Sequence, residues 1–467
     1  MANASRFPRS IKYIVGNEAA ERFSFYGMKA VLTTFLVTQF FNPTNNPNLA
    51  PQAEAHANDI VHFFNTMVYF LPLIGAVAAD WFFGKYGIIL WLSLVYCIGN
   101  AFLAYFNDNL NGFLFGLLLI AIGAGGIKPC VSANVGDQFK SDDPLLPKAY
   151  AWFYFSINVG AFASQMLTPI IMRDFSSSWA FGLPGILMAL ATLVFFLGRK
   201  TYVKAPPVGI NRENFVSISF FAARQYFKGN SVGGGWLEIA KTRFSPERVE
   251  AVKAVYRILA FFSIIPIFWA LNDQNSSEWV LQAKKMDLNF LGHTWLAEQI
   301  QSVNSILVLV YIPLFSVLIF PFLEKRGVRL DPFRKVGFGF LLTIAAFFVI
   351  YKLQLLIDAG QHPNIGWQVV AYVILTAAEV LIYQTGLEYA YTQAPASMKS
   401  TIMSFWLLTI AAGNYIVSAL NGSIAAGGIF SQLTGANFYL FFMGLMAVAT
   451  LAFFVIARKM KRSKNAK

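Results

Sequence analysis

The sequence predicts an all-α membrane protein, and three observations lead to that class. First, 57% of the 467 residues are hydrophobic and only 13% are charged, whereas soluble domains carry about 25% charged residues. Second, apolar runs such as 14–41 and 87–106 are separated by short polar loops. Each run can cross a hydrocarbon core of about 30 Å, which needs roughly 20 residues. Third, the basic residues gather in alternate connections. Spanning β-strands would instead give short alternating segments.

The apolar runs divide into twelve expected membrane spans, as in the bundle of the major facilitator type with two six-helix halves. Their approximate bounds are 13–41, 59–80, 86–106, 113–134, 149–171, 179–198, 254–275, 299–322, 335–357, 367–391, 398–420 and 437–458.

The distribution of Lys and Arg predicts the orientation. Of the 36 basic residues, 28 lie in the first segment, the last segment and every second connection. Only Arg173, Lys284 and Lys285 lie in the other connections, and five fall within spans. Because cytoplasmic loops are enriched in Lys and Arg, both termini are expected in the cytoplasm. The net charge of +13 thereby follows from topology, and we expect no nucleic-acid partner.

The longest connection divides the chain into three parts: 1–198, the N-terminal half; 199–253, a cytoplasmic linker; and 254–467, the C-terminal half. The linker is too polar to cross the membrane and is expected to hold one or two short helices. Residues Phe215–Phe227 suit the membrane surface, and a fully solvated linker fits the pattern equally well. Six spans on each side are typical of transporters built from two repeats.

Charged side chains inside the first span need partners or water. A charge at the bilayer centre costs about 2.5–3.5 kcal/mol, and a helical stripe of this span holds Glu18, Glu21, Arg22, Phe25, Tyr26 and Lys29. This stripe is therefore expected to face the interior of the bundle. Two carboxylates beside one guanidinium leave a surplus negative charge, which a proton would neutralise. A permanently paired ion network is the alternative.

Other spans carry polar residues that suit a cavity or ordinary packing. Lys128 lies in the glycine-rich "GAGGIKPC", although a lysine near a helix end often snorkels to the headgroups. His62 and Tyr69 share a face of the second span, where His62 would carry a proton if it faced an acid. Tyr154 and Asn158 share a face of the fifth span and suit an amide-containing ligand or helix–helix hydrogen bonds.

Signals of catalysis are sparse. The sequence has no Walker loop and no His/Cys zinc spacing. Cys97 and Cys130 both lie in apolar runs and are expected to be reduced packing residues. We therefore expect a protein that is not an enzyme and that uses no metal or cofactor.

Several motifs, in order, resemble those of the proton-dependent oligopeptide transporters, a branch of the major facilitator superfamily. "EAAERFSFYG" resembles the proton-coupling signature of that family, and "GAGGIKPCVSANVGDQF" and "FYFSINVGA" resemble two further signatures. "FWALNDQNSSEWVLQA" and "TGLEYAYTQAP" are similar to segments of the seventh and tenth spans of its animal members. The resemblance extends from residue 18 to about residue 415.

The resemblance implies roles for individual residues. Proton coupling would fall on Glu18, Glu21, Arg22, His62 and Lys128, and the peptide amino terminus on Glu379. The gates would be the ion pairs Lys29–Asp273 on the outer side and Lys128–Glu379 on the inner side. Beside the three cations Arg22, Lys29 and Lys128, the substrate pocket would include Tyr26, Tyr69, Tyr154, Asn158, Trp269, Asn304 and Trp406.

The functional hypothesis is a symporter that imports di- and tripeptides with protons by alternating access. We expect it to be a monomer in lipid, in a bacterial inner membrane, with H+ as its coupling ion. An alternative is a proton-coupled transporter of the same fold for another small anion, such as nitrate or a modified amino acid. A non-transporting sensor or a membrane enzyme is a third hypothesis.

Overall fold

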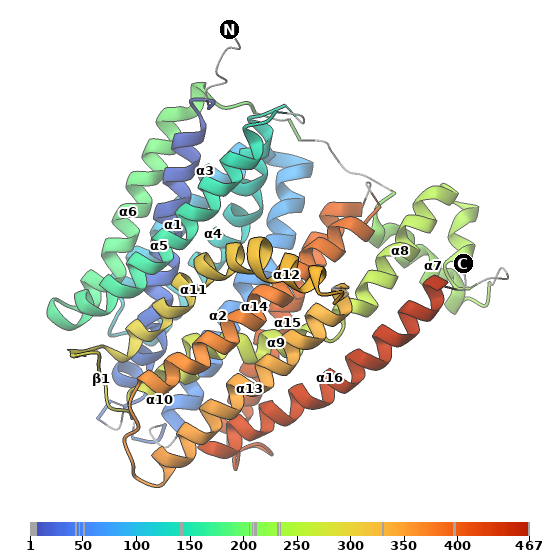
Figure 1. Cartoon of the computed structure of the whole chain (residues 1–467). Coiled ribbons are helices and arrows are strands. Elements are labelled where there is room, and N and C mark those ends of the chain that lie inside the picture. Colours follow the sequence, from blue (N-terminus) through green and yellow to red (C-terminus); the bar gives the residue numbers. More distant parts are fainter. Residues whose placement is uncertain are drawn as a thin grey trace.

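The computed structural model is almost entirely helical (Figure 1). It describes residues 7–42, 44–45, 47–49, 52–140, 143–204, 206–207, 209, 213–230, 233, 235–328, 331–395 and 398–465. The helices of the first half are α1 (Ile11–Phe35), α2 (Ala53–Ala78), α3 (Gly84–Tyr105), α4 (Leu110–Asp137), α5 (Leu146–Asp174) and α6 (Ser177–Leu197). The linker holds α7 (Phe215–Phe227).

The second half begins with two helices that form one bent span, α8 (Pro246–Phe262) and α9 (Ile265–Asn272). The remaining helices are α10 (Glu278–Ala283), α11 (Ser302–Pro313), α12 (Phe320–Lys325), α13 (Pro332–Asp358), α14 (Gly366–Gln393), α15 (Lys399–Ala425) and α16 (Ala436–Asn465). A small antiparallel hairpin of β1 (Asn289–Phe290) and β2 (His293–Thr294) projects from one end of the bundle (Figure 1).

All twelve predicted spans fall on helical segments. Among the described residues, nine helices are long and apolar enough to cross a membrane, or ten with the bent pair α8 and α9. One of the nine is the 53-residue segment Ala53–Tyr105, which is interrupted at Gly84, where φ is +69°. Helix α1 is not one of these nine, because its charged side chains lower its apolar content. Many Leu, Val and Phe side chains on the helices are exposed, for example Val317 at 75%. An apolar surface of this kind is what contact with lipid requires.

Two separate apolar clusters form the core. One joins buried residues from Ile11 to Tyr202, and the other joins residues from Ile218 to Phe453 together with Ala55 of α2. Each half therefore packs mainly on itself, and the junction between the halves carries polar side chains.

The seventh predicted span differs from its expected form. The helix begins at Pro246, eight residues before the expected start at 254, and bends by 45° between α8 and α9. Pro266 follows the break, and its missing N–H and its ring prevent one continuous helix.

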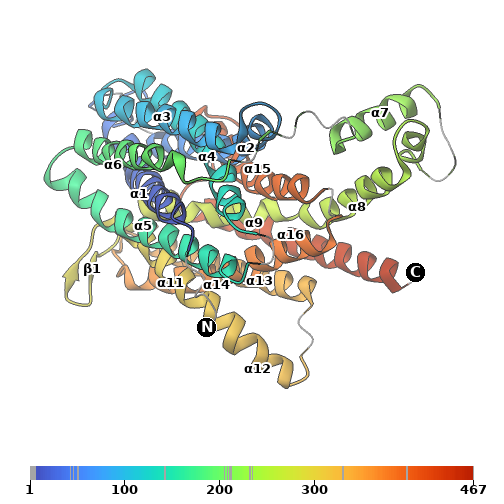
Figure 2. The ribbon, with the colours of Figure 1, turned by 90° about the horizontal axis from the view of Figure 1, so that it is seen from above.

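The linker contains the predicted helix over Phe215–Phe227, set apart from the bundle (Figure 2). Asn214 caps it, and its Ile218 and Ala222 pack against the second cluster. Lys241 of the linker pairs with Glu250 of α8 at 2.8 Å, and Lys253 of α8 pairs with Glu238 of the linker. These ion pairs tie the linker to the start of α8. Its placement on the membrane surface stays a prediction.

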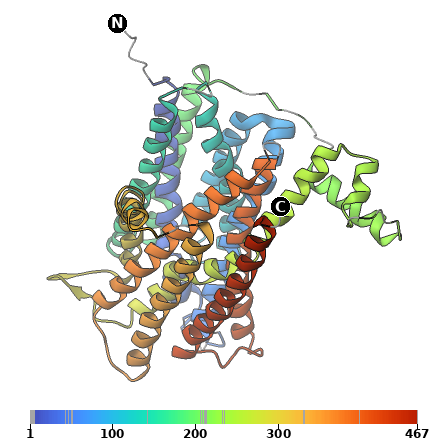
Figure 3. The same cartoon turned by 45° about the vertical axis from the view of Figure 1, so that its right-hand side comes forward.

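Hydrogen bonds between the halves gather at one end of the bundle, which we call the closed end. It is formed by the end of α1, the start of α2, α10 and the 3-10 turn η7 (Ala297–Gln301), at the bottom in Figures 1 and 3. Gln301 donates to the carbonyl oxygen of Ala30 at 3.0 Å, and Ser305 donates to Gln165 at 2.8 Å. Gln299 and Ser418 make two further hydrogen bonds across the junction.

Helices α1 and α5 cross very closely at Gly160. A Cβ atom there would lie 2.6 Å from the carbonyl oxygen of Ala19 and 3.3 Å from the Cβ of Arg22. Only a glycine allows this approach, which places α5 against the charged stripe of α1.

We expect Gly160→Ala to lower the free energy of unfolding by about 1–3 kcal/mol, the usual cost of overpacking. Thermal unfolding of the purified protein in detergent measures this change. Gly444→Ala is the matched control, because no atom lies within 4 Å of its added Cβ. Equal melting temperatures for the two variants would contradict the close crossing.

Candidate functional site

The charged stripe of α1 is buried at the junction between the halves, as the sequence predicts. Glu18, Glu21, Arg22 and Lys29 are each less than a tenth exposed. The Nε of Arg22 lies 2.7 Å from Oε1 of Glu18 and 3.0 Å from Oε2 of Glu21. One guanidinium therefore lies beside two carboxylates.

The two carboxylates are not equivalent. The single Nε–H of Arg22 donates to Glu18, so Glu21 has only an ion-pair contact. Neither oxygen of Glu21 has a hydrogen-bond donor among the described residues. A buried carboxylate oxygen without a donor is costly unless it is protonated or hydrated.

Two further cations of the first half lie near this motif without a carboxylate partner in the described part of the chain. The ammonium of Lys128 lies over the ring of Phe25, 3.9 Å from its centroid, and 4.9 Å from that of Tyr69. Lys29 is 8% exposed. Within 4 Å, the structure joins neither Lys29 to Asp273 nor Lys128 to Glu379. Both gate pairs therefore stay predictions for other conformations.

The second half contributes a carboxylate to the same junction. Asn304 of α11 donates to Oε2 of Glu379 at 2.7 Å and also contacts Thr376 at 3.1 Å. Cations thus come from one half and a carboxylate from the other.

The expected pocket aromatics divide into exposed and buried groups. Tyr154 is 37% exposed, and its carbonyl oxygen accepts from Asn158 within α5. Trp269 and Trp406 are almost fully buried and pack with Tyr383, whose centroid lies 5.8 Å from that of Trp406. The two tryptophans therefore support the wall and present little surface of their own.

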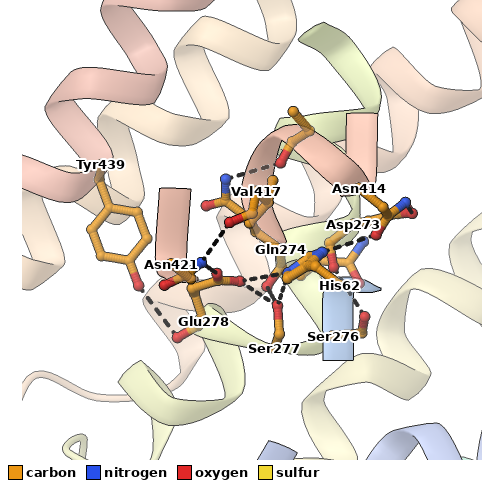
Figure 4. Close-up of polar contacts among 12 residues, drawn as sticks. His62, Asp273, Gln274, Ser276, Ser277, Glu278, Asn414, Val417, Asn421 and Tyr439 are labelled. Carbon is orange, nitrogen blue, oxygen red and sulfur yellow. Dashed lines mark hydrogen bonds and ion pairs between the residues drawn. The ribbon is translucent and has the colours of Figure 1, made fainter. Parts of the chain in front are cut away.

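His62 lies in a polar cluster at the closed end rather than beside Arg22 (Figure 4). Its Nδ1 is 2.8 Å from Oδ1 of Asn414, and its Nε2 is 2.8 Å from Oγ of Ser277. The Nε2 also lies 3.2 Å from Oε2 of Glu278. Asn414 in turn donates to Asp273 at 2.5 Å.

Sequence reasoning missed three residues of these clusters: Glu278, Tyr383 and Asn414. Glu278 could have been found as a charge in the apolar "SSEWVLQA", and Tyr383 as one helical turn after Glu379. Asn414 carries no signal, because a single amide in an apolar span is common.

Two helical halves with complementary charges at their junction define a membrane protein of the major facilitator type. Residues 86–430 match the POT family. The chain belongs to this family, in agreement with the motifs in the sequence.

Peptide transporters and solute carriers from animals are similar to this chain in sequence. Solute carrier family 15 member 2 of Mus musculus is 37% identical over 394 residues, which are 80% of this chain and 53% of the relative. Peptide transporter family 1 of Drosophila melanogaster is 37% identical over 373 residues, 76% of this chain and 49% of the relative. The chain spans about half the length of the curated relatives it matches.

Solved structures agree in fold along nearly the whole chain. The crystal structure of the POT family transporter PepTSo has a TM-score of 0.88 at 37% identity, covering 98% of this chain and 99% of that one. The structure of an auto-inhibited POT family peptide transporter has a TM-score of 0.86 at 36% identity, covering 97% of each chain.

The asymmetry around Arg22 predicts unequal effects on stability. Arg22→Met leaves two buried carboxylates uncompensated and should cost about 3–5 kcal/mol of unfolding free energy. Glu21→Gln leaves a balanced Arg22–Glu18 pair and should cost much less. Thermal unfolding in detergent at neutral pH compares them, and a larger loss for Glu21→Gln would contradict the assigned contacts.

Proposed function

We propose that this protein imports di- and tripeptides together with protons by alternating access, across a plasma membrane such as the bacterial inner membrane. The observation that carries the proposal is the buried Glu21, which lies 3.0 Å from Arg22 but receives no hydrogen bond from it. Family membership and relatives named as peptide transporters support the same function.

Protonation of Glu21 would change the charge of the motif. With both carboxylates ionised, Glu18, Glu21 and Arg22 carry one surplus negative charge. A proton on Glu21 removes that surplus and strengthens the attraction of Arg22 and Lys128 for a substrate carboxylate. Proton binding and peptide binding thereby favour each other, and no cofactor beyond H+ is needed.

The opposite charges of the two halves suit the carboxylate and the ammonium that every short peptide carries. Arg22, Lys29 and Lys128 would attract its carboxylate, and Glu379, held by Asn304, would take its ammonium. A bound peptide would then draw the halves together. The aromatic side chains Tyr26, Tyr69 and Tyr154, backed by Trp269 and Trp406, would accept varied side chains, since apolar pockets discriminate by only about 1–3 kcal/mol. Asn158 would add an amide contact.

The distribution of basic residues supports an outward position of the closed end, because the alternate connections with few Lys and Arg lie there. The structure would then be open toward the cytoplasm. Separation of Lys128 from Glu379 fits an open inner gate. Lys29 and Asp273 are not paired although the outer end is closed here, so hydrogen bonds such as that of Gln301 to Ala30 hold this end. The Lys29–Asp273 pair would then belong to another step of the cycle. The protein would act as a monomer, because both halves of the site come from one chain.

We expect Glu21→Gln to retain peptide exchange and to lose proton-driven accumulation. Proteoliposomes loaded with unlabelled dipeptide measure exchange at equal pH, and a pH gradient across empty vesicles measures accumulation. Accumulation should fall at least about tenfold while exchange stays within about threefold.

Uptake by the wild-type protein in the same assay distinguishes a peptide transporter from a transporter of another small anion. Excess nitrate or free amino acid should leave labelled dipeptide uptake unchanged, whereas unlabelled dipeptide should abolish it. Loss of uptake on adding nitrate would favour the anion-transporter alternative, and full accumulation by Glu21→Gln would remove Glu21 from the coupling step.

The proposed role of Glu379 predicts selective loss of affinity. Glu379→Gln should weaken the binding of a dipeptide with a free amino terminus by about 1.5–3 kcal/mol, the value of a hydrogen bond to a charged group. An N-acetylated dipeptide, which has no ammonium, should be affected much less. Inhibition constants for the two competitors against labelled dipeptide give the comparison, and equal losses would refute ammonium recognition.

A further inference from the structure

We propose that a cavity in the linker binds the headgroup of an anionic phospholipid, and that the neighbouring face of α7 lies among the acyl chains. The sequence predicts only that this helix suits the membrane surface, and a solvated linker fits the sequence equally well. The cavity adds a specific ligand, a phosphodiester with an uncharged headgroup such as phosphatidylglycerol. This lipid site is separate from the peptide site, and its test does not depend on transport.

One face of α7 is apolar and exposed. Val216, Phe220 and Phe227 are 70%, 69% and 87% exposed, and their spacing places them within one narrow stripe of the helix, which we call the apolar ridge. Ile218 and Ala222 lie on the opposite face and are fully buried against the second half. Large apolar side chains gathered in one exposed stripe mark a surface that an apolar medium or a partner covers.

The position of α7 favours lipid as the medium that covers the ridge. Seen from above, α7 lies beside the bundle and not across its end (Figure 2), and it lies away from the closed end (Figures 1 and 3). Shortly after α7, helix α8 begins the bent span at Pro246. Helix α7 therefore lies near the level at which the chain enters the membrane, where an amphipathic helix buries its apolar face at the headgroup boundary.

A cavity of about 460 Å³ lies between α7 and the residues that follow the 3-10 turn η5 (Glu238–Thr242). The rings of Phe221 and Phe244 pack together from its two sides, with centroids 5.6 Å apart. Each side also supplies a guanidinium group, Arg224 from α7 and Arg243 from beyond η5. Arg243 lies over both rings, 5.3 and 5.7 Å from their centroids. These cation–π contacts hold the guanidinium and leave its N–H donors available to a ligand.

The charges of the lining suit a phosphodiester. Among the described residues, neither Arg224 nor Arg243 has an ion-pair partner within 4 Å. The third charged residue of the lining, Glu213, accepts a hydrogen bond from Oγ of Ser245 at 3.4 Å. Two arginines and one glutamate leave one net positive charge, which a single phosphodiester balances. A glycerol headgroup adds hydroxyl donors and no charge, whereas the ammonium of ethanolamine would leave the positive charge uncompensated.

A bound lipid would anchor the second half through the linker. Phe215, at the start of α7, packs against Tyr256 of α8 and Phe405 of α15, with ring centroids 5.2 and 5.1 Å apart. The lipid held beside α7 would thereby fix two spans of the second half to the membrane surface.

Protection of a thiol in the cavity tests the lipid site. In a full-length background with Cys97 and Cys130 replaced by Ala, Ser217→Cys places one thiol in the lining. The measurement is the lipid concentration that halves the rate of labelling by a water-soluble maleimide, with the protein in a neutral detergent. The probes are dioctanoyl phosphatidylglycerol, dioctanoyl phosphatidylethanolamine and inorganic phosphate.

Phosphatidylglycerol should protect the thiol at a concentration at least about tenfold lower than phosphatidylethanolamine, and inorganic phosphate, which has no acyl chain, should need the highest concentration. Arg224→Gln and Arg243→Gln should each raise the concentration of phosphatidylglycerol by about fivefold, and Lys at either position should retain most of the protection. Arg326→Gln is the matched control, because this exposed arginine also lies over a phenylalanine ring, 4.4 Å from the centroid of Phe322, but does not line the cavity.

Phe220→Ser should weaken protection by the two lipids to a similar extent, because this side chain contacts acyl chains and not the headgroup. Equal protection by the two lipids, or unchanged protection in both Arg→Gln variants, would overturn the headgroup site. Protection that rises with protein concentration when no lipid is added would show that a second copy of the chain covers the ridge, and would also overturn it. Thermal unfolding of each variant confirms that lost protection is not a lost fold.

Discussion

The cost of a charge in hydrocarbon governs this structure. Helix α1 carries Glu18, Glu21, Arg22 and Lys29 in a part of the chain that must otherwise be apolar. Each would cost a few kcal/mol facing lipid, so all four turn to the junction between the halves. The cores of the two halves are accordingly separate apolar clusters, and the surface between them is polar. A polar junction can open and rewet, whereas one continuous apolar core could not.

Close packing connects this charged stripe to the neighbouring helix. At Gly160 the backbone of α1 almost touches α5, one helical turn from Arg22. Helix α5 also carries Tyr154 and Asn158 toward the junction and Gln165 toward the closed end. If the Arg22 side chain moved after losing a partner, α5 would move as well, because the two helices are too closely packed at their crossing for the side chain to move alone. Protonation in the motif and movement of the gate would thereby share one rigid pair of helices.

The sequence was sufficient to predict the family, the helical segments and the face on which the α1 charges lie, because these depend on composition, periodicity and local motifs. It was insufficient for contacts between the halves. His62 and Asn414 are 352 residues apart, and periodicity gives a face and a depth but no partner. The seventh span was expected to begin eight residues too late, because residues 246–253 are largely polar although they already form the helix and pair with the linker. Trp269 and Trp406 were expected in the pocket, but packing against Tyr383 and Gly386 buries them.

The strength of the closed end limits how a small signal can open it. Several of its contacts are hydrogen bonds between neutral groups, such as Gln301 to Ala30 and Ser305 to Gln165, each worth about 0.5–1.5 kcal/mol. The hydrogen bond from Ser418 to the carboxylate of Asp59 is worth about 1.5–3 kcal/mol. The exposed Glu54–Lys285 pair adds no more than about 1 kcal/mol. A gate of strong buried ion pairs would resist opening by more than one proton could offset. Since a population shift of a few kcal/mol suffices between two nearly balanced states, a single proton and a bound peptide at the Glu21 motif would have the right magnitude to decide which end is closed.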